Sequence, residues 1–106
     1  LALDMTQETV TQALAKKADM LITHHPAIFH KLGNVTDADW QQELLLQLAE
    51  NGVAVYSAHT NLDCVANGVN SVLAKRLRLQ DADVLDTVSG LGRIGELELC
   101  RLIILP

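Results

Sequence analysis

The residues best suited to chemistry are three histidines and one aspartate, which lie in two polar segments. His24 and His25 are adjacent and precede a proline, and His59 and Asp63 are the first and last residues of the segment HTNLD. Imidazole and carboxylate groups bind divalent ions such as zinc, iron, manganese or nickel. We therefore hypothesise a metal site whose ligands are His24, His25 and Asp63.

The spacing of the two adjacent histidines favours two ions over one. Neighbouring side chains of a regular strand point to opposite faces, so His24 and His25 do not readily share one ion. Each can serve its own ion where the chain turns into a loop, and Asp63 can bridge two metals about 3.5 to 4 Å apart. Such a pair of ions holds a bridging hydroxide for hydrolysis, and we assign His59 the catalytic role of moving a proton.

A purely structural interpretation of the same residues stays open. In that interpretation His24 and His25 form a polar loop pair, and His59 is a hydrogen-bonded side chain. Asp63 then caps the helix that follows it. Neither segment contains a compact ligand motif such as HExxH, so the pattern alone does not exclude this alternative.

The remaining reactive residue types predict no further site. We interpret His30 as a loop histidine, and Cys64 and Cys100 as small buried thiols, because the sequence pairs neither thiol with a base. The segment GLGR at 90–93 has neither of the common phosphate-loop spacings and predicts a turn. The basic segment KRLR at 75–78 predicts a solvated helix end.

Three helices and three apolar strands are expected to position the histidines and the aspartate. Apolar stripes predict helices that begin after Thr6, after Asp37 or Asp39, and at Asn67-Gly68, the second of them ending at Asn51-Gly52. The third helix is expected to turn Val69, Val72, Leu73 and Leu77 inward. Short apolar runs predict strands at 1–4, 20–23 and 53–57, the last two buried on both faces. Residues 79–86 stay unassigned, and the run at 96–105 is strand-like.

The alternation of strands and helices predicts an α/β fold with a parallel or mixed sheet and crossover helices. Ligands in such sheets bind beyond the carboxyl ends of the strands. His24 and His25 follow one predicted strand, and His59 and Asp63 follow the next. The fold class and the candidate residues are therefore mutually consistent.

Composition restricts the partners of the chain. The 106 residues are 49% hydrophobic and carry a formal net charge of -5, which suits a domain with one core and gives no basic surface for nucleic acid. The longest apolar run is far shorter than the roughly 20 residues of a membrane span. Two cysteines and no apolar leader favour the cytoplasm. We expect residues 1–106 to form a single α/β domain, an excerpt of a longer, two-lobed chain, because both ends are strand-like.

Several segments together resemble one known family. They are Leu3-Asp4, LITHHP at 21–26, VYSAHTNLD at 55–63, GVN at 68–70 and GLGRIG at 90–95. Their order and spacing resemble the Nif-three-like dinuclear metal proteins, which are also known as GTP cyclohydrolase I type 2 homologues. The resemblance covers residues 1–95, the N-terminal portion of that family.

The resemblance implies a partial Nif-three-like domain with two divalent metal ions in each subunit of a ring-like hexamer in the cytoplasm. His24 and His25 would bind the two ions, Asp63 would be the shared carboxylate, and His59 would lie in the site. Family members complete the site with a histidine and a glutamate from a Gly-His motif, and this sequence has no Gly-His pair. The implied function is metal-dependent hydrolysis of a small-molecule substrate, and the alternative is a non-catalytic metal-binding scaffold or interaction protein.

Overall fold

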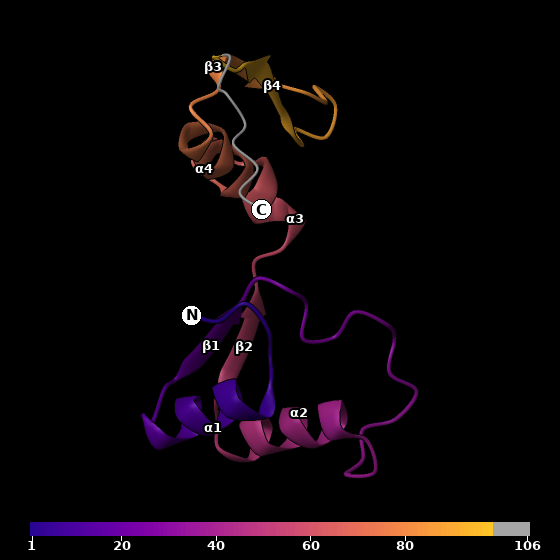
Figure 1. The fold of residues 1–106 in the computed structure, drawn as a ribbon. Helices are drawn as coiled ribbons and strands as arrows, with labels where there is room; N and C mark the ends of the chain where they lie inside the picture. The colour runs from indigo at the N-terminus through magenta and orange to yellow at the C-terminus, as the bar shows by residue number, and fades with distance from the viewer. Residues whose placement is uncertain (99–106) are drawn as a thin grey trace, which may run out of the picture. The chain divides into compact units, whose positions relative to one another are not determined.

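The computed structural model describes residues 1–98, which divide into two compact units. The first unit is Leu1–His59, and the second begins at Thr60. Cys100 and the larger part of the apolar run predicted at 96–105 lie outside the described residues. Each unit has its own secondary structure (Figure 1).

The first unit is a small α/β layer built on two parallel strands. Its elements in chain order are α1 (Gln7–Ala15), β1 (Met20–Thr23), α2 (Trp40–Glu50) and β2 (Ala54–Ser57). β1 and β2 pair in parallel, with Met20 opposite Ala54 and Thr23 opposite Ser57, and Ala2 forms a parallel bridge to Thr23. Figure 1 shows the two strands side by side, joined through α2 as the crossover. The predicted α/β fold with a parallel sheet is confirmed.

Side-chain caps determine where the two helices of this unit begin. The hydroxyl of Thr6 accepts a hydrogen bond from the backbone N–H of Thr9 at 3.2 Å, and the Thr9 hydroxyl accepts one from the N–H of Thr6 at 2.8 Å. Asp39 caps α2 by accepting from the N–H groups of Gln41 and Gln42. Of the two caps that the sequence allowed, Asp39 is therefore the one used, because its carboxylate satisfies two N–H groups that the first helical turn leaves unpaired.

The end of α2 is a Schellman motif, as the Asn51-Gly52 pair predicted. The N–H of Gly52 donates to the carbonyl of Ala49 at 3.1 Å, and the N–H of Val53 donates to that of Leu48 at 2.9 Å. Gly52 has a φ of 68°, a conformation that glycine adopts without steric cost. The turn leads the chain directly into β2.

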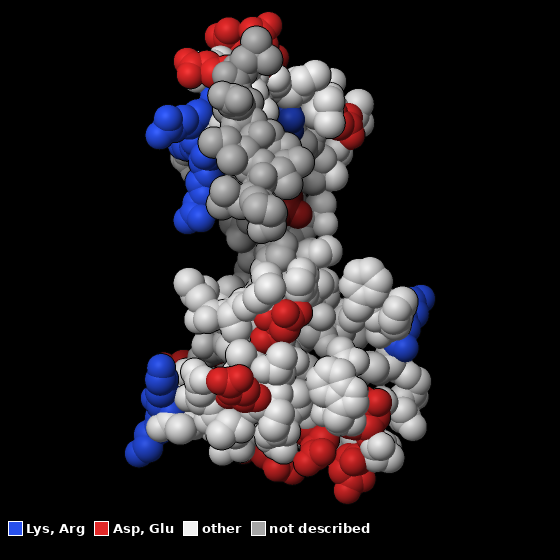
Figure 2. All heavy atoms as spheres, in the orientation of Figure 1, with Lys and Arg blue, Asp and Glu red and all other residues white. Residues whose placement is uncertain are grey.

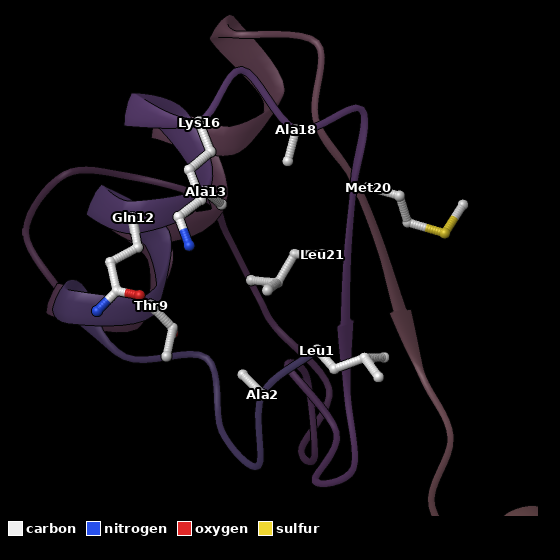
Figure 3. Close-up of a pocket in the computed structure, with 9 residues that line it drawn as sticks. All are labelled: Leu1, Ala2, Thr9, Gln12, Ala13, Lys16, Ala18, Met20 and Leu21. Carbon is white, nitrogen blue, oxygen red and sulfur yellow. The ribbon is translucent and has the colours of Figure 1, made fainter.

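The core of the first unit lies between the helices and one face of the strand pair. Val10 of α1 and Leu44 and Leu48 of α2 are at most 1% exposed, and Leu21 of β1 packs with them. Burial of each such side chain contributes about 1.5 to 3 kcal/mol. In Figure 3, Leu21 points toward α1 whereas Met20 points away from it. The alternation of the strand therefore sends every second side chain into the core.

The prediction that both strands are buried on both faces is wrong. Met20 is 51% exposed and Tyr56 is 52% exposed, and both lie on the same face of the strand pair, with Ile22 and Ala54. The opposite face carries Leu21 and Thr23, which are buried. The runs are uniformly apolar, but α1 and α2 cover one face only.

The second unit contains two helices and an antiparallel hairpin. Its elements are α3 (Thr60–Cys64), α4 (Val69–Arg76), β3 (Gln80–Val84) and β4 (Arg93–Glu96), with Val84 opposite Arg93. The turn predicted at 90–93 is confirmed in part, because Gly90 and Gly92 have φ values of 78° and 72°, whereas Arg93 begins β4. The polar segment HTNLD at 59–63 forms mostly the short helix α3.

The predicted inward face of α4 is wrong. Ser71 and Ala74 are the buried residues of this helix, whereas Val72 and Leu73 are 44% and 51% exposed. The guanidinium of Arg93 donates to the Ser71 hydroxyl at 3.0 Å, so the β3–β4 hairpin packs on the side of α4 with the smaller residues. Leu77, also predicted inward, is 62% exposed.

Candidate metal centre

Three imidazole rings of the first unit cluster at the carboxyl end of its strand pair. The ring centroids of His24 and His25 are 5.2 Å apart, those of His24 and His59 are 5.3 Å apart, and those of His25 and His59 are 6.1 Å apart. His24 and His25 directly follow β1, and His59 follows β2 after Ala58. The structure therefore brings together all three histidines that the sequence singled out in this unit.

A relay of hydrogen bonds fixes the backbone on which the rings stand. The Thr23 hydroxyl donates its one proton to the carbonyl of His25 at 2.7 Å. The Ser57 hydroxyl, 3.0 Å from that of Thr23, must then be the donor in their bond, and it accepts from the N–H of Ala27 at 3.1 Å. The relay joins the last residues of both strands to the loop after His25.

The ring of His24 has a defined tautomer in its neutral form. Its Nδ1 lies 2.8 Å from the carbonyl oxygen of Ala58. A carbonyl oxygen only accepts, so Nδ1 carries the proton and donates it. The lone pair of the neutral ring is then on Nε2, the atom through which such a histidine binds a metal.

The ring of His25 is oriented in the same way by a carboxylate. Its Nδ1 lies 2.6 Å from Oδ1 of Asp4, and both side chains are 49% exposed. Asp4 was not among the predicted site residues. The sequence places Asp4 at the end of the predicted strand at 1–4, but it does not give the register that brings the carboxylate to His25.

The structure also describes the surroundings of the other sequence candidates. Asp63 is a half-buried residue of α3 in the second unit, where its backbone carbonyl accepts from the side-chain amide of Asn70 at 3.2 Å. It does not cap α4, whose N-cap is Gly68, so that part of the structural interpretation is wrong. The ring of His30 contacts that of Phe29, with centroids 5.0 Å apart. Cys64 is only half-buried rather than buried.

His24 and His25 can supply some, but not all, of the ligands that a metal ion requires. Within residues 1–98, no three His, Cys, Asp or Glu side chains converge closely enough to hold an ion on their own. His24 and His25 nevertheless each have Nδ1 hydrogen-bonded to an oxygen acceptor, which is the usual arrangement for metal-binding histidines. The first unit thus presents two oriented imidazoles that need further ligands.

One pocket of the first unit is lined by candidate site residues, and another is not. A pocket of about 320 Å³ is lined by Asp4, His25 and Trp40, and the Trp40 side chain is 64% exposed. The pocket in Figure 3, of about 150 Å³, lies between α1 and β1 and is lined by none of the candidate residues. Space for a small molecule therefore exists directly beside His25.

The face of the first unit that Figure 2 shows carries mainly acidic charged side chains. In Figure 2, Asp and Glu side chains dominate the visible part of that unit that holds α1 and α2. The basic residues of the second unit include Lys75 and Arg76 in the last turn of α4, where cations are favourable. Among the described helices, none has the length and hydropathy required to cross a membrane.

Comparison with known proteins assigns the family. The sequence model of Duf34/NIF3 (NGG1p interacting factor 3) matches residues 1–101. The chain belongs to the Duf34/NIF3 family. The resemblance that the motifs indicated is confirmed.

Relatives within the Duf34/NIF3 family are similar in sequence and in fold. The chain is 42% identical over 103 residues to the GTP cyclohydrolase 1 type 2 homolog of Lactococcus lactis, covering 97% of this chain and 40% of that protein. It is 40% identical over 74 residues to human NIF3-like protein 1, covering 70% of this chain and 20% of that protein. The chain thus spans two fifths or less of the length of these relatives.

Solved structures give the same result. The solved structure of reduced HcgD from Methanocaldococcus jannaschii matches with a TM-score of 0.79 and 38% identity, covering 89% of this chain and 37% of that one. A Bacillus cereus protein related to NIF3 matches with a TM-score of 0.74 and 39% identity, covering 80% and 24%. The Duf34/NIF3 fold and sequence are therefore shared over most of this chain.

Proposed function

We propose that this chain supplies the histidine ligands of a dinuclear metal site that carries out hydrolysis. The observation that carries the proposal is the pair of Nδ1 hydrogen bonds, from His24 to the Ala58 carbonyl and from His25 to Asp4. Each bond places the lone pair of the neutral ring on Nε2, as metal binding requires. His24 and His25 would each bind one ion, and Asp63 would be the shared carboxylate.

The roles of the remaining groups follow from their chemistry. Divalent ions such as zinc, iron, manganese or nickel would lower the pKa of a bound water and polarise the bond under attack. His59, whose ring centroid is 5.3 Å from that of His24, would accept and return a proton. The pocket beside His25 would hold the substrate.

The substrate class proposed is a nucleotide-like molecule attacked at a ring carbon or a phosphoester. Its support is the name of several relatives, GTP cyclohydrolase 1 type 2 homolog. The exposed indole of Trp40 at the same pocket is a surface on which a planar ring can stack. The proposal extends to a cytoplasmic, ring-like hexamer of the longer family chain.

The first experiment is elemental analysis of the chain purified without chelator. We expect bound divalent metal in near-stoichiometric amount, lost when His24 and His25 are both replaced by alanine. The control is His30→Ala, which removes an exposed imidazole from the same unit and should leave the metal content unchanged. Equal metal content in all three proteins would disprove the ligand assignment.

A non-catalytic metal-binding scaffold is the second candidate. It is favoured by the family description, which names an interacting factor. A catalytic site keeps an open coordination position and a structural site does not, so turnover separates the two. Hydrolysis of GTP by the metal-loaded protein, abolished by His59→Ala with the metal retained, would support the enzyme. Absence of turnover together with unfolding on metal removal would support the scaffold.

A further inference from the structure

We infer that Asp4 is the positioning residue that orients His25 toward its metal ion. The inference rests on the proposed metal site and adds a residue that neither the motifs nor the relatives assign. The Oδ1 atom of Asp4 is 2.6 Å from Nδ1 of His25. An ionised carboxylate only accepts hydrogen bonds, so it holds the proton of the neutral ring on Nδ1 and leaves Nε2 to act as the ligand.

Backbone hydrogen bonds to the end of β1 fix the residues just before Asp4. The N–H of His24 donates to the carbonyl of Ala2 at 3.2 Å, and the N–H of His25 donates to the carbonyl of Leu3 at 2.9 Å. These two bonds set the register that places Asp4 beside His25. Sheet-like pairing of the chain before Asp4 with the end of β1 therefore positions the Asp4 carboxylate.

The backbone of Asp4 is also held on the helix side. The hydroxyl oxygen of Thr9, in the first turn of α1, lies 3.0 Å from the carbonyl oxygens of both Asp4 and Thr6, which share its one proton. The same hydroxyl takes part in the reciprocal cap with Thr6 that starts α1. Asp4 thus stands between two fixed elements, which is what a residue that orients another side chain requires.

The two histidines differ in the acceptor that orients them. His24 donates to a neutral backbone carbonyl, whereas His25 donates to a full negative charge. A charged acceptor makes a stronger hydrogen bond and makes the ring a better electron-pair donor to a metal ion. We therefore expect loss of the Asp4 carboxylate to weaken metal binding more than it weakens folding, since a half-exposed hydrogen-bonded pair of this kind contributes little to stability.

The zinc affinity of three variants tests the inference. The probe is Zn²⁺ in competition with a chromophoric chelator, applied to the unsubstituted chain and to Asp4→Ala, Asp4→Asn and Asp19→Ala. Asp4→Ala should bind zinc about 10- to 100-fold more weakly. Asp4→Asn should lie between, because its amide oxygen still accepts from Nδ1. Asp19→Ala removes the same charge from an exposed residue of the same unit and should bind like the unsubstituted chain.

A spectroscopic measurement on the metal-free chain provides a readout independent of zinc. Imidazole ¹⁵N shifts, recorded where the rings are neutral, should show His25 protonated on Nδ1 in the unsubstituted chain and a mixture of tautomers in Asp4→Ala. An unchanged tautomer overturns the inference, as does an affinity loss that Asp19→Ala reproduces. Failure of the unsubstituted chain to bind zinc would overturn the proposed metal site and the inference with it, whereas equal affinities with and without Asp4 would overturn the inference alone.

Discussion

The hydroxyl groups of Thr23 and Ser57 lie 3.0 Å apart across the parallel strand pair, at the last position of both strands. Thr23 is only 1% exposed, so its hydroxyl depends on protein partners for hydrogen bonds. The relay that it forms ends on the carbonyl of His25. Two small hydroxyl residues therefore connect the strand register to the backbone of the candidate metal ligands.

Replacement of Thr23 by valine should destabilise the first unit and disturb the histidine cluster. Valine has nearly the same shape but leaves the Ser57 hydroxyl and the His25 carbonyl without the Thr23 partner, at a cost of about 1 to 3 kcal/mol. Urea unfolding would measure the loss. Thr11→Val, at an exposed position of α1, is the matched control and should change stability by less than about 0.5 kcal/mol. Equal effects of the two substitutions would show that the relay has no special importance.

Replacement of Gly68 by alanine should disrupt the second unit. A Cβ atom at this position would lie 1.7 Å from the carbonyl oxygen of Leu62 in α3, so the backbone must move. We expect a loss of about 3 kcal/mol or more, at the upper end for overpacking. Gly33→Ala is the control, because nothing lies within 4 Å of its added Cβ and its φ is not positive. Thermal unfolding that is the same for both variants would contradict the close approach of α3 to the start of α4.

Acid should loosen the turn that begins at Asp86. Hydrogen bonds from the Ser89 hydroxyl, and then from the N–H of Val88, lower the pKa of the Asp86 carboxyl. The charged form is thus favoured by the folded turn, so this contribution to local order is present above the ordinary aspartate range and is lost as the pH falls through the lowered pKa. Ser89→Ala should raise the pKa of Asp86, measured by a carboxyl-detected NMR titration. An unchanged midpoint would show that the Ser89 bond does not form in solution.

The parts of the fold that could be predicted are those where local signals agree. α2 combines an apolar stripe, an aspartate cap and an Asn-Gly end, and it forms at 40–50 as expected. β3 at 80–84 has the sequence QDADV, which has no apolar alternation, and its pairing with β4 arises from tertiary contacts. The apolar stripe of α4 was visible, but the side on which the hairpin packs depends on the contact of Arg93 with Ser71.

The candidate site, like the fold, could be predicted from the sequence only in part. The meeting of His24, His25 and His59 could be predicted because parallel strands end at one edge. The contact of Asp4 with His25 could not, since it depends on the exact register between the segment before α1 and the end of β1. A residue that orients a ligand contributes no motif of its own, and it becomes visible only when an interatomic distance is known.

The sheet of the first unit also has a consequence for handling the chain at high concentration. Within residues 1–98, β2 has β1 as its only neighbour in the sheet. Its sequence AVYS contains neither a charged residue nor a proline, two of the features that commonly prevent strands from pairing edge to edge with another chain. An unprotected strand of this kind is a template for fibril-like aggregation. The substitution Ala54→Lys, at an exposed position of β2, would be expected to keep the chain monodisperse, and the lysine side chain would not enter the core.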